Sequence, residues 1–114
     1  MRFIYKICRR SEWREAAATG VYRGSADDRR DGFIHFSAAH QLRATAQRHF
    51  AGKDDLVLLA VRAGDLGAAL KWEASRGGDL FPHLYGDLPA KAVLWEKALP
   101  WRDGCHEFPA DIRE

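Results

Sequence analysis

The sequence has little of what marks several common classes of protein. Its 114 residues include only two cysteines, Cys8 and Cys105, and neither belongs to a CxxC pair or another metal-ligand spacing. We therefore expect reduced thiols and no disulfide framework. No apolar run approaches the roughly 18–20 residues of a membrane span, and the opening residues MRFIYKIC lack the apolar segment of a signal peptide. The sequence predicts a cytoplasmic protein without a membrane partner.

Charge of one sign and short catalytic motifs are also missing. The 18 basic and 16 acidic residues are mixed along the chain, whereas nucleic-acid-binding proteins usually carry a basic stripe. The pattern argues against nucleic acid as a partner. The five histidines form neither HxxxH nor HExxH, so we expect no metal site. The phosphate loops GxGxxG and GxxxxGK[ST] and the nucleophile motif GxSxG are absent.

What the chain does have is the composition of one globular domain. Hydrophobic residues make up 46% and charged residues 30%, which suits a folded protein with a single core. We expect a domain over residues 1–100 and an irregular or partly disordered polar tail over residues 101–114. No feature of the sequence fixes the oligomeric state.

Residue patterns predict an α+β fold. Alternation of apolar and polar residues predicts strands over residues 3–7, 33–36, 56–62, 70–72 and 93–98. One helix is expected over residues 12–19, with Ser11 as its N-cap and Gly20 at its end, and another over residues 38–50, with Ser37 as a further N-cap. Residues 21–32 and 74–89 are expected to be loops. The later connections are too short for crossover helices, which favours small mixed or antiparallel sheets with flanking helices over a doubly wound sheet.

The long segment 74–89 is the first candidate for a functional site. Loops of more than about twelve residues in compact domains are usually functional or disordered. The apolar and aromatic residues of segment 74–89 would anchor it to the domain, so that Arg76, His83 and Tyr85 are held at fixed positions. The alternative is a well-packed surface loop without a ligand.

Polar residues on the predicted strands are the second candidate. His35 shares a strand face with Ser37, and it is either an acid–base or ligand-contacting group or a core histidine bonded to backbone carbonyls. Lys6 either contacts a phosphate or carboxylate or is an edge-strand lysine that discourages association between sheets. Glu73 precedes Arg76, and an exposed ion pair between them would contribute little.

In combination, the segments IYKI, DGFIHFS and WE-SRGG-LFPHLYG-LP resemble an uncharacterised bacterial family, the domain of unknown function 952. The likeness runs from residue 3 to about residue 100. That family in turn resembles the ADP-ribosyltransferase superfamily, in which two small split antiparallel sheets clasp NAD. The resemblance implies a cleft for NAD or an ADP-ribose-like nucleotide.

The same resemblance implies roles for individual residues. Lys6 falls where the superfamily has an Arg or His that grips the cofactor, and His35 and Ser37 lie in a motif similar to its aromatic-x-Ser strand. Glu73 is the nearest match to the carboxylate that acts at the nicotinamide ribose. The catalytic candidates are therefore Glu73 and His35, and the ligand-binding candidates are Lys6, Ser37, Arg76, His83 and Tyr85. A transferase-like enzyme and a non-catalytic ligand-binding or regulatory module both stay open.

Overall fold

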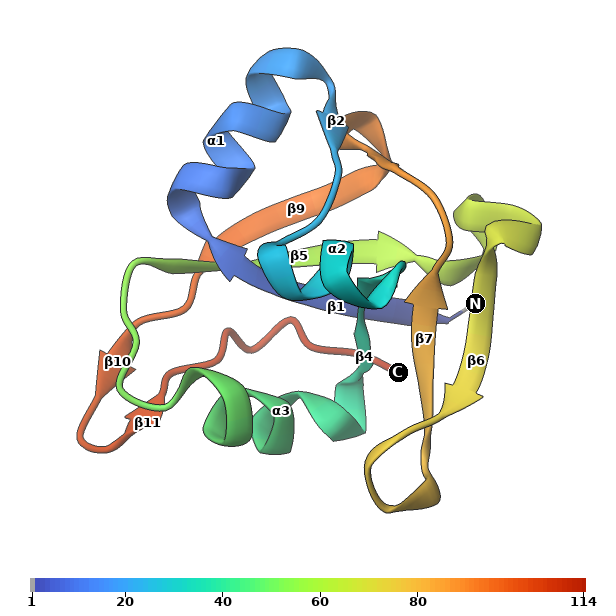
Figure 1. Ribbon diagram of the computed structural model, residues 1–114. Helices are drawn as coiled ribbons and strands as arrows, with labels where there is room; N and C mark the ends of the chain where they lie inside the picture. The colour runs from blue at the N-terminus through green and yellow to red at the C-terminus, as the bar shows by residue number, and fades with distance from the viewer. Residues whose placement is uncertain (1) are drawn as a thin grey trace.

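The computed structural model describes residues 2–114, except for the side chain of Arg76 (Figure 1). Its largest sheet has four strands in the order β4-β1-β5-β9, with the bounds Phe3–Arg9 (β1), Ser37–Ala38 (β4), Leu56–Arg62 (β5) and Val93–Ala98 (β9). β1 and β5 are buried along almost their whole lengths, which explains their nearly continuous apolar sequences.

Three smaller sheets complete the strand pairing. One has the order β3-β7-β6, formed by Ile34–His35 (β3), Leu80–Leu84 (β7) and Leu70–Ala74 (β6). The others pair Val21–Tyr22 (β2) with Leu88–Pro89 (β8) and Trp101–Arg102 (β10) with Cys105–His106 (β11). Every pair in the described residues is antiparallel, so the prediction of an α+β fold without a doubly wound sheet is confirmed.

Helices lie on both faces of the four-stranded sheet (Figure 1). The α-helices span Arg10–Thr19 (α1), Ala26–Asp31 (α2) and Leu42–Phe50 (α3). Short 3₁₀ segments span Ala39–Gln41 (η1), Ala63–Ala69 (η2), Arg76–Gly78 (η3) and Ala90–Ala92 (η4). None of the helices in the described part of the chain combines the length and apolarity that a bilayer crossing requires.

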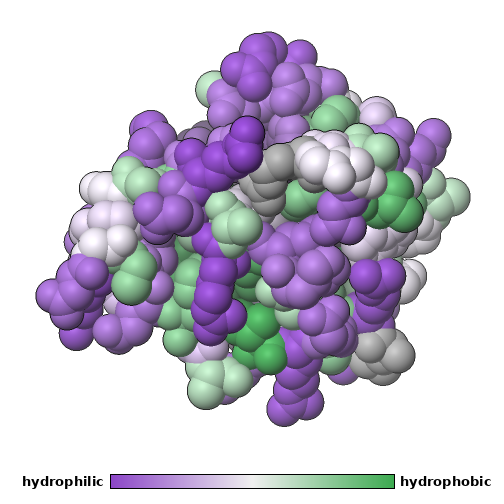
Figure 2. Space-filling model, turned by 90° about the horizontal axis from the view of Figure 1, so that it is seen from below, coloured by the Kyte–Doolittle hydropathy of each residue, from purple (hydrophilic) through white to green (hydrophobic). Residues whose placement is uncertain are grey.

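The alternating side chains of β1 and β5 divide the core into two clusters. Ile4 and Leu59 belong to the cluster that packs under α1 and the three-stranded sheet. Tyr5 and Leu58, one position along, belong to the cluster that packs against α3. The face seen from below, where α3 and the C-terminal tail lie, is covered largely by hydrophilic residues, with apolar residues visible between them (Figure 2). The four-stranded sheet therefore lies between the two core clusters and packs against both of them.

The first helix and the segment after it differ from the sequence prediction. The helix begins at Arg10 with Arg9 as its N-cap, two residues before the predicted N-cap Ser11, because β1 runs directly into it. Residues 21–32 are not a loop: they contain β2 and α2, and α2 is capped by Ser25. The prediction of a loop failed because α2 is only six residues long and almost entirely charged.

The second helix and the long segment also differ. Ser37 lies in β4 rather than at a helix N-cap, and the expected helix is divided into η1 and α3. The segment 74–89 contains η3, β7 and β8. The tail forms the β10–β11 hairpin, and Phe108 and Ile112 pack against the cluster below the sheet. Cys8 and Cys105 are both free thiols.

Candidate functional site

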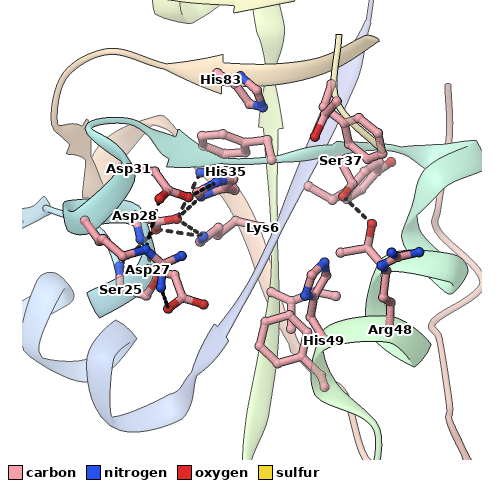
Figure 3. A pocket seen from close by; sticks show the side chains of 18 of the residues that line it. Lys6, Ser25, Asp27, Asp28, Asp31, His35, Ser37, Arg48, His49 and His83 are labelled. Carbon is pink, nitrogen blue, oxygen red and sulfur yellow. Dashed lines mark hydrogen bonds and ion pairs between the residues drawn. The ribbon is translucent and has the colours of Figure 1, made fainter. Parts of the chain in front are cut away.

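A cavity of about 530 Å³ opens between α2 and β3 on one side and α3 on the other (Figure 3). β1 contributes Tyr5, Lys6 and Ile7 to its lining, and β7 contributes Phe81 and His83. The four-stranded sheet and the three-stranded sheet therefore both reach this cavity, which we call the main pocket.

Asp28 organises the wall formed by α2 and β3. It is only 2% exposed, and its Oδ1 atom accepts hydrogen bonds from the backbone N–H of His35 at 3.1 Å and from Lys6 Nζ at 3.0 Å. The same Oδ1 lies 2.6 Å from His35 Nδ1, and Oδ2 accepts from the backbone N–H of Ser25 at 2.9 Å. One buried carboxylate thus joins α2, β1 and β3.

The local sequence explains why Asp28 sits there. Ser25 and Asp28 form a capping box in which each side chain accepts a hydrogen bond from the other residue's backbone N–H. The preceding residue, Gly24, has a φ of +99°, and a Cβ added there would lie 2.7 Å from Asp28 Cβ. Glycine is therefore required both by the turn into α2 and by the close approach of Asp28.

The charge of Asp28 is compensated inside the protein. Burial alone would raise the pKa of Asp28, but the hydrogen bond from His35 and the positive charge of Lys6 outweigh it and hold this pKa well below its usual range. Lys6 itself is 5% exposed and lies 2.8 Å from Asp28 Oδ2. This is a buried ion pair whose charges are satisfied by one another and by neighbouring hydrogen bonds.

His35 also contacts a second carboxylate. Its Nε2 atom lies 3.0 Å from Asp31 Oδ2, one helical turn before it, so each ring nitrogen faces a carboxylate oxygen. A hydrogen bond from Arg30 lowers the pKa of Asp31, and the charge of His35 adds to the effect. The His35 side chain is 38% exposed and is thus open to a ligand.

His83 lies at the edge of the main pocket above His35 and Lys6 (Figure 3). Its Nδ1 atom is 2.8 Å from Glu73 Oε1, and the same oxygen accepts a hydrogen bond from the Tyr85 hydroxyl at 2.8 Å. The hydrogen bond from His83 is the main cause that lowers the pKa of Glu73, and the bond from Tyr85 adds to it. The bond to Glu73 in turn raises the pKa of Tyr85. The ring of Phe33 stacks on His83 with centroids 4.0 Å apart. His83 is therefore held by both a carboxylate and an aromatic ring.

The opposite wall has hydroxyl and basic groups. Ser37 Oγ donates to Thr45 Oγ1 at 3.2 Å, which joins β4 to α3. Arg48 and His49, in the last turn of α3, complete this side, and Figure 3 shows them across the pocket from Asp28 and Asp31. The main pocket thus has carboxylates and an imidazole on one wall and hydroxyl and basic groups on the other.

The structure brings together four of the residues that the sequence singled out. Lys6, His35, Ser37 and His83 all line the main pocket. Glu73 and Tyr85 are not among its lining residues, and Glu73 reaches the pocket through its bond to His83. The side chain of Arg76, another of the predicted ligand-binding residues, lies outside the described part of the chain, so its predicted role stays a prediction.

Two alternatives from the sequence are wrong. Lys6 is not an edge-strand lysine, because β1 lies between β4 and β5 in the sheet order and Lys6 is buried against Asp28. His35 is not a core histidine bonded to backbone carbonyls, because both of its ring nitrogens face carboxylates. These contacts explain how two polar side chains are accommodated on apolar strands.

Sequence reasoning missed several residues of the site, above all Asp28, Asp31 and Arg48. The Ser25-x-x-Asp28 spacing of a capping box was the available signal for α2. The four-residue spacing of Asp31 and His35 would then have indicated their contact. Among the described residues, no group of three or more His, Cys, Asp or Glu side chains is arranged to hold a metal ion.

Comparisons with known proteins give a family and a fold. The sequence model of the family described as "Protein of unknown function (DUF952)" matches residues 7–96. The X-ray crystal structure of protein CC0527 from Caulobacter crescentus is 52% identical in sequence, with 92% of this chain and 93% of that chain covered and a TM-score of 0.89. The solution NMR structure of CC0527 is 53% identical, with 90% and 88% covered and a TM-score of 0.81. Among curated proteins there is no significant match.

Proposed function

The chain belongs to the DUF952 family, and we propose on that premise that its main pocket binds a nucleotide of the ADP-ribose type, such as NAD or ADP-ribose. The observation that carries the proposal is the pairing of two chemically different walls around one cavity of about 530 Å³. Sites for ligands of this size usually measure about 300–1,000 Å³ and combine apolar surface with a few placed polar groups.

The groups on the two walls suit the parts of such a ligand. Arg48 would bind phosphate oxygens, because a guanidinium forms charge-assisted hydrogen bonds with them. Asp31 and Ser37 would bind ribose hydroxyls, as acidic residues do in many dinucleotide sites. Phe36 and Phe81 supply aromatic surface to the lining. Lys6 would act indirectly, because its charge is held by Asp28.

The resemblance of the sequence motifs to those of ADP-ribosyltransferases is the reason to propose NAD as the ligand, and two functions are then to be distinguished. In the first, the protein transfers or cleaves at the nicotinamide ribose, with Glu73 acting through His83. In the second, the protein is a non-catalytic binding or regulatory module. One observation argues against catalysis by Glu73 at the nicotinamide ribose: the Glu73 carboxylate lies outside the lining of the pocket, where it accepts hydrogen bonds from His83 and Tyr85.

A binding experiment tests the shared part of the proposal. NAD, ADP-ribose, AMP and ribose 5-phosphate are titrated against the protein by calorimetry and by thermal unfolding. Ligand at about a hundred times its dissociation constant stabilises a fold by roughly 2.7 kcal/mol, which raises the melting temperature by about ten degrees in a domain near this size. Arg48→Ala should weaken ADP-ribose binding at least about tenfold, whereas Arg102→Ala, on the exposed β10 strand, should not. If none of the four compounds binds, the proposal is wrong.

Glu73→Gln then separates the two functions. With NAD as substrate, the enzyme hypothesis expects release of nicotinamide that this substitution abolishes while NAD affinity is kept. The module hypothesis expects NAD to bind without any release of nicotinamide from the unmodified protein.

A further inference from the structure

We propose that His83 and His35 form an acid–base pair that cleaves a phosphodiester bond. The inference rests on the proposed function in one respect, namely that the ligand of the main pocket carries phosphate. It assigns the chemistry to two imidazoles rather than to a carboxylate at the ribose.

The two imidazole rings are placed where both can reach one group of a ligand. His35 and His83 are partners in the β3–β7 register, so their side chains emerge on the same face of the sheet. Their ring centroids are 5.7 Å apart and both rings line the main pocket. Phe33 lies against both rings, with centroids 4.6 Å from His35 and 4.0 Å from His83. A single phosphorus centre can therefore lie within reach of both imidazoles.

The two rings also differ in their hydrogen-bond partners. A neutral His83 that donates from Nδ1 to Glu73 carries its lone pair on Nε2, which is the form of a general base. A protonated His35 donates from Nδ1 to Asp28 and from Nε2 to Asp31, which is the form of a general acid. Two like groups are thus fixed in environments that suit opposite roles.

The proton and electron balance of the step is complete without a further reactant. A water molecule, or a hydroxyl of the ligand, attacks phosphorus while its proton passes to His83 Nε2. The bond from phosphorus to the leaving oxygen breaks, and the electron pair stays on that oxygen, which replaces Asp31 Oδ2 as the acceptor at His35 Nε2 and takes the proton from this nitrogen. His83 ends protonated and His35 neutral. His35 regains its proton from solvent because it is partly exposed, and His83 loses its proton through the main pocket that it lines.

The groups around the pair suit reaction at phosphorus better than reaction at a sugar carbon. Asp28 and Glu73 hold the imidazoles, and the two other carboxylates of the lining, Asp27 and Asp31, are paired with Arg30. None of these four is therefore placed as the free nucleophile that many glycosidic reactions require. An anionic phosphate suits the remaining groups, since Arg48 lies on the facing wall. Phosphodiester cleavage is therefore the reaction class that the pair serves best.

The test compares two substrates that differ in their leaving group. In 2′,3′-cyclic AMP an alkoxide leaves and needs a proton, whereas in bis(p-nitrophenyl) phosphate a stable p-nitrophenolate leaves without one. His83→Gln should lower kcat/KM at least about a hundredfold on both substrates, in line with the usual contribution of a general base. His35→Gln should lower it about a hundredfold on the cyclic nucleotide and less than about threefold on the aryl ester. Gln is chosen because its amide N–H groups can still donate hydrogen bonds to the carboxylates that face each histidine.

Two further variants complete the design. His40→Gln is the matched control, because His40 lies outside the main pocket against Asp79 and Glu114, and it should leave both reactions unchanged. Glu73 is a positioning residue in this scheme, so Glu73→Gln should lower kcat with little change in KM. ADP-ribose binding is measured for every variant, and retained binding shows that the pocket is folded.

The outcomes distinguish the two proposals. If ADP-ribose binds and neither phosphodiester is cleaved, the acid–base pair is wrong and the binding proposal stands. If the cyclic nucleotide is cleaved and neither NAD nor ADP-ribose binds, the proposed ligand class is wrong and the pair stands. An equal loss on both substrates in His35→Gln would remove His35 as the acid. If the protein neither binds NAD or ADP-ribose nor cleaves either phosphodiester, both proposals are wrong.

Discussion

At the scale of single residues, Asp28 does most to build the main pocket. It accepts hydrogen bonds from the backbone of Ser25 and His35 and from the Lys6 side chain, and it faces the His35 ring. The pair with Lys6 is almost fully removed from solvent. Removing one charge of such a pair leaves the other buried without a partner, and that is costly.

Asp28→Asn should therefore lower the free energy of unfolding by about 3–5 kcal/mol at pH 7. The pKa of Asp28 in the folded protein is below its unfolded value of about 3.9, so its contribution is complete above that value and is lost as pH falls through the folded value. Urea unfolding of the unmodified protein and of Asp28→Asn should show a difference in unfolding free energy that persists from pH 8 to 5. This difference should shrink only below about pH 4.

The control for this prediction is Asp87→Asn. Asp87 forms an exposed contact with Arg23 at 3.7 Å, so its loss should change the unfolding free energy by less than about 1 kcal/mol. A gap for Asp28→Asn that is already lost at pH 6 would contradict the buried, compensated charge described above.

The residues of the site were predictable where a strand period governs them. His35 and Ser37 lie on the pocket side of β3 and β4, as a period of two requires, whereas His83, on the same side of β7, was predicted only as a residue of the long segment 74–89. Asp28 was not predictable in this way. It is one of three aspartates in the sequence ADDRRD, and only the docking of α2 against β1 and β3 separates it from its neighbours.

At the scale of secondary structure, α2 depends on the site that it helps to form. Six residues are too few for a helix that is stable in isolation. The capping box of Ser25 and Asp28 holds its first turn, and the bonds from Asp28 to β1 and β3 hold it against the sheet. The helix and one wall of the main pocket should therefore be lost together.

Gly24→Ala should show that dependence. The added Cβ would lie 2.7 Å from Asp28 Cβ at a φ of +99°, so we expect a loss of about 1 kcal/mol from backbone strain and about 1–3 kcal/mol from the clash. Gly20→Ala is the matched control, since Gly20 has a φ of +90° and nothing within 4 Å of the added atom. Urea unfolding and ADP-ribose titration of both variants measure the difference. Equal losses of stability, with binding intact, would show that α2 tolerates displacement.

The elements that the sequence predicted best are those with a long apolar or alternating pattern. The strands over residues 56–62 and 93–98 have the predicted bounds, and the strand over residues 70–72 extends to Ala74. β7 was missed because its sequence LFPHL contains Pro82, and a proline argues against an inner strand. In the structure, the Pro82 carbonyl accepts a hydrogen bond from Phe36 N–H at 3.0 Å, a distant contact that no local pattern reveals.

At the scale of the whole molecule, the C-terminal tail closes the lower half of the core. Phe108 and Ile112 pack against the cluster that contains Tyr5 and Leu42. The Tyr5 hydroxyl donates to the Arg113 carbonyl at 2.8 Å and accepts from the Arg113 N–H at 2.7 Å. A residue of the first strand therefore anchors the last residues of the tail.

Tyr5→Phe should loosen that anchor without disturbing the sheet. The loss of the paired hydrogen bonds should cost about 1–2 kcal/mol, because two backbone groups of Arg113 lose their partner. Hydrogen exchange at residues 110–114 should become faster, while exchange in β5 changes little. Tyr85→Phe is the control, since Tyr85 is 42% exposed and lies far from the tail in sequence and sheet. Unchanged protection of the tail in Tyr5→Phe would contradict its anchoring by this hydroxyl.

The central position of β1 has a consequence for biosynthesis. Its long partner is β5, with Arg9 opposite Leu56, so an apolar strand emerges from the ribosome roughly fifty residues before the strand that covers it. At about 5–20 residues per second this interval lasts on the order of 3–10 s. During it the segment FIYKIC is exposed as a strand-forming sequence of the kind that aggregates, and Lys6 places a charge at its centre. The side chain that is later buried against Asp28 thus protects the nascent chain before Asp28 can reach it.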